Sequence, residues 1–234
     1  MGNINQIYKY RVETHLHTNQ ASACAANTGA EMARFSKKAG LCAIVVTDHF
    51  FNGNTNIRGN YSWDEKITLY MRGYQDAKQQ GDKIGLDVYF GFEYSWHGAE
   101  FLIYNFGEEQ LRCYPEIMTE SIEKVFTKIK TSGGFIIHAH PFRTASYIQN
   151  PGQIFPEYTD AVEIINTHNA NEANRLALEY AEKYKLIKFG GSDTHWATPQ
   201  DGGMMFARKP ESLNDIIDMA RKQECVILGE KYLW

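Results

Sequence analysis

Short apolar runs alternate with amphipathic segments along most of this chain. The runs are rich in β-branched and aromatic side chains, which is typical of buried strands. They predict strands over residues 7–12, 42–47, 86–92, 101–106, 135–137, 161–165, 186–189, 204–207 and 225–228. The segments between them predict helices over residues 28–38, 62–80, 120–130 and 172–184, and a last helix from residue 212. Strands that alternate with helices favour a parallel α/β architecture.

Capping residues support two of the predicted helices. Thr28 with Glu31, and Ser62 with Glu65, have the spacing of capping boxes, so a helix is expected to begin at each pair. We expect the second of these helices to end at Gly81, because glycine readily adopts the left-handed conformation found just past a helix end.

Residues that can bind metals follow six of the predicted strands. The first are His15 and His17, which lie two positions apart and should project to the same side of a strand end. In a (β/α) barrel the C-terminal ends of the strands meet at one rim, where we expect such residues to converge. An open Rossmann-like sheet is the alternative, but no Gly-x-Gly-x-x-Gly sequence follows the first strand. The candidates are His15, His17, Asp48, His49, Glu93, His138, His140, His168, Asp193 and His195.

The chemistry of these side chains points to metal-dependent hydrolysis. Imidazole together with carboxylate suits Zn, Mn or Fe. One catalytic zinc needs about three protein ligands, so the larger number of candidates indicates a centre of two or three ions, with Glu93 as a bridging carboxylate. Such a centre suits phosphoester hydrolysis, because it can activate water and stabilise the attacking and leaving oxygens.

Composition and charge narrow the class of protein. The chain has 234 residues, 43% hydrophobic and 22% charged, so it can bury a sizeable core, and we expect residues 1–234 to form one domain. The net charge of -4 argues against a dedicated nucleic-acid binder. No apolar run approaches the roughly 20 residues that span a membrane, and no signal-peptide pattern is evident. Four scattered cysteines fit reduced thiols, so we expect a cytoplasmic protein.

Five motifs occur in the order in which they occur in the PHP (polymerase and histidinol phosphatase) family, which this chain resembles from about residue 10 to about residue 200. They are His15-x-His17-Thr, Thr47-Asp48-His49, Gly91-x-Glu93, Ala139-His140-Pro141 and Gly191-Ser-Asp193-x-His195. The resemblance implies an α/β fold, a distorted seven-stranded, TIM-like (β/α) barrel with its metal site at the C-terminal ends of the strands. It also implies a phosphoric ester hydrolase that uses a metal-bound hydroxide on a small ester such as histidinol phosphate or a nucleotide.

The same resemblance implies roles for individual residues. A first ion would be held by His15, His17, Glu93 and Asp193, a second by Glu93 and His140, and a third by His49 and His195. Asp48 would be a ligand or a group that orients one. His138 is either a ligand or only hydrogen-bonded, and His168 is a ligand, the acid for the leaving group or an exposed histidine. Arg143 follows His140 by three residues and could bind a phosphate with two hydrogen bonds.

The chain departs from the family pattern in two places. Many relatives have Asp or His a few residues after the first histidine pair, where this chain has only the polar and small residues 19–24. We expect Cys24 in this stretch, like most free cysteines, to be a small buried hydrophobe. Many relatives also have a histidine on the strand after the bridging glutamate, a place that Glu100 or His168 could fill.

Three other functions stay open at this point. Amidohydrolase-type barrels also begin with His-x-His, but they typically bridge their metals with a modified lysine, and no lysine ends a ligand-bearing strand here. A PHP-type nuclease or proofreading module, of the kind attached to DNA polymerases, would bind nucleic acid despite the net charge of -4. A non-catalytic, metal-stabilised regulatory domain is the last. We expect a small phosphorylated substrate and no membrane partner, while the oligomeric state does not follow from the sequence.

Overall fold

A computed structural model of the chain describes residues 7–146, 148, 152–198, 201–229 and 233. Its strands form one sheet in the order β7-β6-β5-β4-β3-β2-β1-β8-β9. The strands are β1 (Tyr10–Leu16), β2 (Leu41–Val46), β3 (Asp87–Trp96), β4 (Ala99–Tyr104), β5 (Phe135–Ala139), β6 (Ala161–Asn166), β7 (Ile187–Gly191), β8 (Met204–Phe206) and β9 (Cys225–Ile227). The helices are α2 (Gly29–Lys38), α3 (Trp63–Tyr70), α4 (Arg72–Ile84), α5 (Glu108–Arg112), the 3-10 helix η1 (Pro115–Met118), α6 (Ile122–Thr131), α7 (Asn171–Tyr184) and α8 (Leu213–Arg221).

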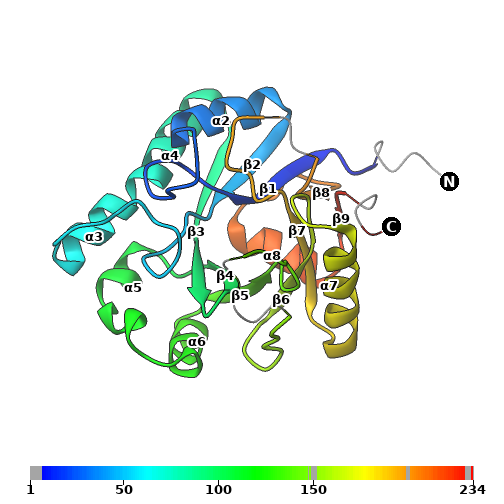
Figure 1. The fold of residues 1–234 in the computed structure, drawn as a ribbon. Coiled ribbons are helices and arrows are strands. Elements are labelled where there is room, and N and C mark those ends of the chain that lie inside the picture. The colour runs from blue at the N-terminus through cyan, green and yellow to red at the C-terminus, as the bar shows by residue number, and fades with distance from the viewer. Residues whose placement is uncertain (1–6, 147, 149–151, 199–200, 230–232, 234) are drawn as a thin grey trace.

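The sheet curls until β7 meets β1. The Thr14 hydroxyl donates to the Gly190 carbonyl over 2.6 Å, and the His17 amide donates to the Thr194 carbonyl over 2.9 Å. Helices cover the outside of this nearly closed barrel (Figure 1). The prediction of a distorted barrel is therefore confirmed.

The strand count and directions differ from a simple seven-stranded parallel barrel. In the described part of the chain the sheet has nine strands, of which β4 runs antiparallel to β3 and β5, and β8 antiparallel to β1. The two residues His97 and Gly98, with φ angles of 50° and 94°, join β3 to β4. Positive φ at both positions is typical of a two-residue hairpin, so β4 follows β3 without a crossover helix.

The core has an inner part and an outer layer. Inside the barrel, side chains such as Val12, Tyr104 and Phe189 pack against α8, which closes one end. Outside, β2 packs against α2 and α4, β6 against α7, and β3 and β4 against α3, α5 and α6. Because α8 fills the N-terminal end of the barrel with apolar side chains, buried polar groups have room at the opposite end.

One helix prediction needs correction. The segment predicted as one helix over 62–80 forms two helices, α3 and α4, and α4 continues through Gly81 to Ile84. The left-handed residue that ends it is Gly85, with φ 70°. Gly81 has a packing role instead, because a Cβ there would lie 2.6 Å from the carbonyl oxygen of Leu86. Among the residues that the structure describes, we find no helix with the length and apolar character of a membrane span.

Candidate metal centre

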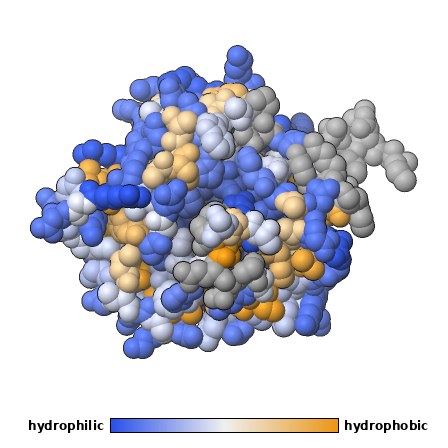
Figure 2. Space-filling view, viewed as in Figure 1, coloured by the Kyte–Doolittle hydropathy of each residue, from blue (hydrophilic) through white to orange (hydrophobic). Residues whose placement is uncertain are grey.

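Buried acidic side chains gather at the open end of the barrel. In the described residues, six carboxylates are less than 9% exposed: Glu13, Asp48, Glu93, Glu100, Glu163 and Asp193. Figure 2 shows hydrophilic side chains in the hollow at the middle of this face. Because an unpaired buried carboxylate is costly, such groups are normally paired with cations or coordinate metals. This end of the barrel therefore favours the binding of cations.

The first histidine pair lies at the centre of this cluster. His15 and His17 are fully buried, and their Nε2 atoms are 3.1 Å apart. The Nε2 atom of His15 lies 3.3 Å from Glu93 and 3.3 Å from Asp193, and that of His17 lies 3.1 Å from the same Asp193 oxygen. The four residues predicted for a first ion are thus together.

A second group forms around Glu93. His140 Nε2 lies 3.2 Å from Glu93 Oε1 and 3.6 Å from Glu100 Oε2. On the other side, His49 Nδ1 lies 2.5 Å from Glu93 Oε2, but the two atoms are not aligned for a hydrogen bond and neither has another hydrogen-bond partner. Glu100 reaches this group because β4 is antiparallel and begins at the rim where β3 ends. Of the two residues named for the second departure from the family pattern, Glu100 is therefore the one that lies beside His140.

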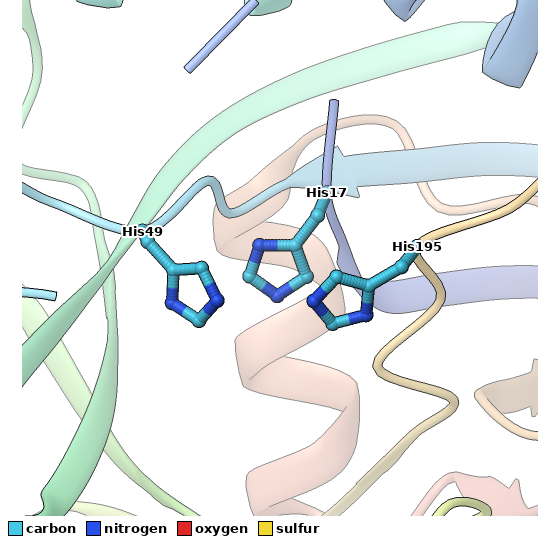
Figure 3. Close-up of side chains that lie close together, drawn as sticks. All are labelled: His17, His49 and His195. Atoms are coloured by element: carbon cyan, nitrogen blue, oxygen red, sulfur yellow. The ribbon is translucent and has the colours of Figure 1, made fainter. Parts of the chain in front are cut away.

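A third group consists of His17, His49 and His195. Their rings are 4.4 Å apart between His17 and His49 and 4.3 Å apart between His17 and His195. Figure 3 shows one ring nitrogen of each histidine turned toward the other two rings. One nitrogen from each lies within 4.8 Å of the others, so these imidazoles could share one ion.

Cys24 lies beside this third group. Its thiol is half-buried, and Cys24 lines the same cavity as His49 and His195. Burial alone would raise the pKa of the Cys24 thiol, but these two histidines lower it to about 6. The expectation that Cys24 is a buried hydrophobe does not describe this environment.

The second histidine pair is divided. His140 enters the site, whereas His138 lies on the other side of β5, where its ring stacks on Phe101 at 4.7 Å and contacts Phe155 and Tyr180. Since β5 ends at Ala139 and His140 has φ 28°, the backbone turns between the two histidines and the strand alternation does not apply to them. Burial and, to a smaller extent, the nearby His140 lower the pKa of His138 to about 3.

The residues predicted to assist the ligands lie around these groups. Asp48 accepts hydrogen bonds from the Thr18 amide and hydroxyl and from the Ser22 hydroxyl, all over 2.6–2.7 Å. Because Ser22 also contacts His17 Nδ1 over 3.0 Å, Asp48 orients this histidine through the serine.

Arg143 and His168 border the open side of the site. The Arg143 guanidinium donates to Asp193 over 2.6 Å and to Asn166 and Asn169 over 3.0 and 2.9 Å. His168 lies next to it, and its Nδ1 lies 2.5 Å from the carbonyl of Ser192. Cavities of about 640 and 360 Å³ adjoin these side chains, both lined in part by Arg143, Asp193, His195 and Trp196.

Electrostatics divide the carboxylates into two kinds. Burial would raise the pKa of Glu93, but the charges of His49 and His15 hold it well below its usual range. Burial would likewise raise the pKa of Asp193, and His15 and Arg143 hold it well below. The pKa of Glu100 is raised by burial and by the neighbouring Glu93 carboxylate. The ionised form of Glu100 is thus disfavoured beside the ionised Glu93. A cation bound between the two carboxylates would stabilise the ionised form of both.

Comparisons with known proteins agree with this geometry. The model of the PHP-associated family matches residues 171–198, which include Asp193 and His195. A PolC-type DNA polymerase III of Latilactobacillus sakei is 23% identical over 154 residues, or 65% of this chain. The chain spans about 9% of the length of that polymerase.

Solved structures share the fold. A two-domain protein of Bacteroides vulgatus that contains a predicted PHP-like metal-dependent phosphoesterase has a TM-score of 0.69 at 15% identity, over 97% of this chain and 68% of its own. A protein of Bifidobacterium adolescentis proposed to be a metal-dependent phosphoesterase has a TM-score of 0.54 at 14% identity, over 91% and 96%. An amidohydrolase of Chromobacterium violaceum with bound sulfate has a TM-score of 0.53 at 12% identity, over 94% of this chain and 99% of its own.

The predicted resemblance to the PHP family is confirmed. Two further carboxylates at the candidate site, which sequence reasoning missed, contact the candidate ligands. Glu163 contacts His15 Nδ1 over 3.0 Å and accepts the His140 amide over 3.1 Å, while Glu13 accepts the amides of His15 and Ser192. Glu163 is the one charged residue of the buried strand β6, and that is the signal by which the sequence could have revealed it, whereas Glu13 shares β1 with Arg11 and has no such signal.

Close packing and local backbone shape also constrain the candidate site. A Cβ at Gly191 would lie 2.5 Å from Glu163 Oε1 and 2.7 Å from His15 Cβ, so only glycine fits there. His140 and Asp193 have φ angles of 28° and 54°. Such left-handed residues other than glycine cost about 1–3 kcal/mol each and concentrate at functional sites. The fold therefore holds these two side chains in place at a cost in stability.

Proposed function

We propose that this protein is a metal-dependent phosphoesterase of the PHP type, with residues 1–234 as one catalytic domain. The observation that carries the proposal is the pair His49 Nδ1 and Glu93 Oε2, two buried atoms that lie 2.5 Å apart without a hydrogen bond. The two atoms lie at ion-pair distance without the alignment of a hydrogen bond, and both are good ligands for a divalent ion.

The arrangement fits two or three divalent ions of the Zn, Mn or Fe class. One would be held by His15, His17, Glu93 and Asp193, a second by Glu93, Glu100 and His140, and a third by His49 and His195. Bound ions would supply Lewis acidity and lower the pKa of a coordinated water molecule. Glu93 takes part in two of these sets, which supports its predicted role as a bridging ligand.

Two side chains of the chain itself would act on the substrate. Arg143 would bind phosphate oxygens at the edge of the site, and its contacts with Asn166, Asn169 and Asp193 would hold the guanidinium in position while negative charge develops. His168 would donate from Nδ1 to the Ser192 carbonyl, which leaves Nε2 to exchange a proton with the leaving oxygen. The cavity of about 640 Å³ has the size of sites that bind small organic molecules, so a small phosphate monoester is the proposed substrate.

Metal analysis combined with a hydrolysis screen tests this proposal. Purified protein, as isolated and after addition of Mn or Zn, would be assayed with phosphate monoesters, a phosphodiester, an oligonucleotide and an amide substrate. We expect bound divalent metal and hydrolysis of at least one monoester. Asp193→Asn should reduce the rate by at least about a hundredfold, since a ligand matters at least as much as the groups that orient ligands.

His97→Asn serves as the matched control, because His97 is exposed and its positive φ of 50° is compatible with asparagine. Its rate should match that of the unchanged protein. A protein that binds no metal, or that hydrolyses none of the phosphate esters, would contradict the proposal. Cleavage of the amide or of the oligonucleotide in place of the monoesters would favour the amidohydrolase or the nuclease function instead.

A further inference from the structure

The turn after β6 holds both side chains that would act on the substrate. Arg143 and His168 line the same cavity of about 360 Å³, and both are bonded to Asn166, the last residue of β6. The Oδ1 atom of Asn166 accepts from Arg143 Nη2 over 3.0 Å and from the backbone amide of His168 over 3.0 Å. Asn166 is fully buried, so water does not compete for these bonds. One oxygen atom therefore sets the place of a guanidinium and of an imidazole relative to each other.

The other end of the Asn166 carboxamide faces the group that supports the candidate ligands. Its Nδ2 donates to Glu163 Oε2 over 3.0 Å, and the same oxygen accepts the His140 amide over 3.1 Å. Burial would raise the pKa of Glu163, but the charge of His15 and its bond to Glu163 lower it, so the carboxylate is ionised and only accepts. Because Arg143 only donates, the carboxamide has a single orientation. Asn166 thus connects the substrate side of the site with the candidate metal centre.

Further hydrogen bonds keep this turn rigid. The buried side chain of Asn174 on α7 accepts the Asn166 amide at Oδ1 over 3.1 Å and donates from Nδ2 to the Asn166 carbonyl over 3.1 Å. The imidazole of His168 has a second attachment, since its Nδ1 lies 2.5 Å from the Ser192 carbonyl. Buried networks whose polar groups are satisfied fix the positions of their members. The amide and the ring of His168 are therefore both held, and Asn166 holds the amide.

We propose that Asn166 is a positioning residue that aligns the Arg143 guanidinium with the His168 imidazole, so that one binds the phosphate while the other protonates the leaving oxygen. The inference rests on the proposed function and adds a residue to it. As the bond from phosphorus to the leaving oxygen breaks, His168 Nε2 gives its proton to that oxygen and regains one from solvent. Without Asn166 the guanidinium keeps its bonds to Asp193 and Asn169, whereas the His168 amide loses its acceptor. Protonation of the leaving group should therefore suffer more than phosphate binding.

Two substrates separate these two roles. 4-Nitrophenyl phosphate releases a stable anion that needs no proton, whereas an alkyl phosphate releases an alkoxide that does. The readout is the ratio of kcat/KM on the two esters, measured with metal-loaded protein. The variants are Asn166→Ala, Asn166→Leu, which keeps the volume without an acceptor, and Asn166→Asp, which keeps an acceptor. Asn169→Ala is the matched comparison, because the Asn169 side chain accepts from Arg143 Nε over 2.9 Å and donates to Asn174 over 3.3 Å. Circular dichroism and metal analysis accompany each variant.

We expect Asn166→Ala and Asn166→Leu to lower kcat/KM on the alkyl phosphate by about a hundredfold, because a reacting group displaced by about 1 Å can lose that much. On 4-nitrophenyl phosphate the loss should stay within about tenfold, the effect of one bond to the guanidinium. Asn166→Asp should recover most of the rate on the alkyl phosphate. Asn169→Ala should lower both rates equally. His168→Ala should change the ratio as Asn166→Ala does, and the double variant should change it no further.

A ratio that does not move in the folded Asn166→Ala or Asn166→Leu protein would overturn the inference, since a merely structural loss lowers both rates alike. A ratio that moves further in the double variant would also overturn it, because Asn166 would then act independently of His168. In both cases the proposed phosphoesterase activity stands. Hydrolysis of neither ester by the unchanged, metal-loaded protein would overturn the proposed function and the inference with it.

Discussion

The chain contains two His-x-His pairs at the ends of strands, and their side chains lie in different surroundings. His15 and His17 both enter the candidate metal centre, with their Nε2 atoms 3.1 Å apart. Of the second pair, only His140 enters it, and His138 packs among aromatic side chains on the opposite side of β5. An identical spacing in the sequence therefore brings two histidines to the candidate site in one case and one histidine in the other.

The backbone explains the difference. At the first pair, His17 follows directly on β1, and its amide still bonds to Thr194 beside the strand, so strand alternation extends through both histidines. At the second pair the strand ends between them, and the left-handed φ of His140 turns its side chain into the site. Residues two apart share a side only where the backbone stays extended. Spacing alone therefore does not identify a pair of ligands.

The largest effect on activity should come from the same substitution, His to Gln, made at each position of the second pair in turn. His140→Gln removes a predicted ligand, so we expect kcat/KM to fall by at least about a hundredfold and one ion to be lost. His138→Gln removes a ring that contacts no other candidate ligand, so its rate per folded molecule should change by less than about threefold. Steady-state kinetics with metal analysis measures both. Equal losses in the two variants would mean that His138 belongs to the site after all.

A smaller effect should come from the carboxylate below the first pair. Glu163 contacts His15 Nδ1 over 3.0 Å and also accepts the His140 amide, so it positions one ligand from each pair. Glu163→Gln keeps the shape but removes the charge, and the metal affinity should fall by about 10–100-fold. Competition with a coloured chelator measures the affinity. Because both amide and carboxylate can bond to an imidazole, an unchanged affinity would show that the negative charge of Glu163 has no role.

Much of this architecture could be predicted because it depends on local patterns. The apolar runs located the strands, and the rule that their C-terminal ends converge placed Asp193 and His195 opposite His15. The antiparallel course of β4 could not be predicted in this way, since it follows from the hairpin at His97 and Gly98. That hairpin brings Glu100 to the rim and leaves it beside His140.

Other features depend on contacts between distant segments. Glu163 and Glu13 lie within strands, and their partners His15 and Ser192 come from elsewhere in the chain. Gly81 resembled a helix end in sequence, but the close approach of Leu86 decides its role. Cys24 was expected to be apolar in character, but its loop places it at the cavity that His49 and His195 also line. Tertiary packing, which pattern analysis does not contain, determines each of these.

The smallest effect concerns the histidine that stays outside the site. Burial holds the pKa of His138 at about 3, below the ordinary value of 6.5, so below about pH 6.5 the unfolded chain binds a proton that the folded chain does not. Its contribution to stability is therefore lost as the pH falls, by about 1 kcal/mol between about pH 7 and about pH 5.5. His138→Phe keeps an aromatic ring beside Phe101 and removes this proton, so its free energy of unfolding should fall less over that interval. Urea unfolding of the unchanged protein and of His138→Phe, both metal-depleted, at the two pH values gives the two free energies of unfolding. Equal losses of free energy of unfolding in the two proteins would contradict the lowered pKa of His138.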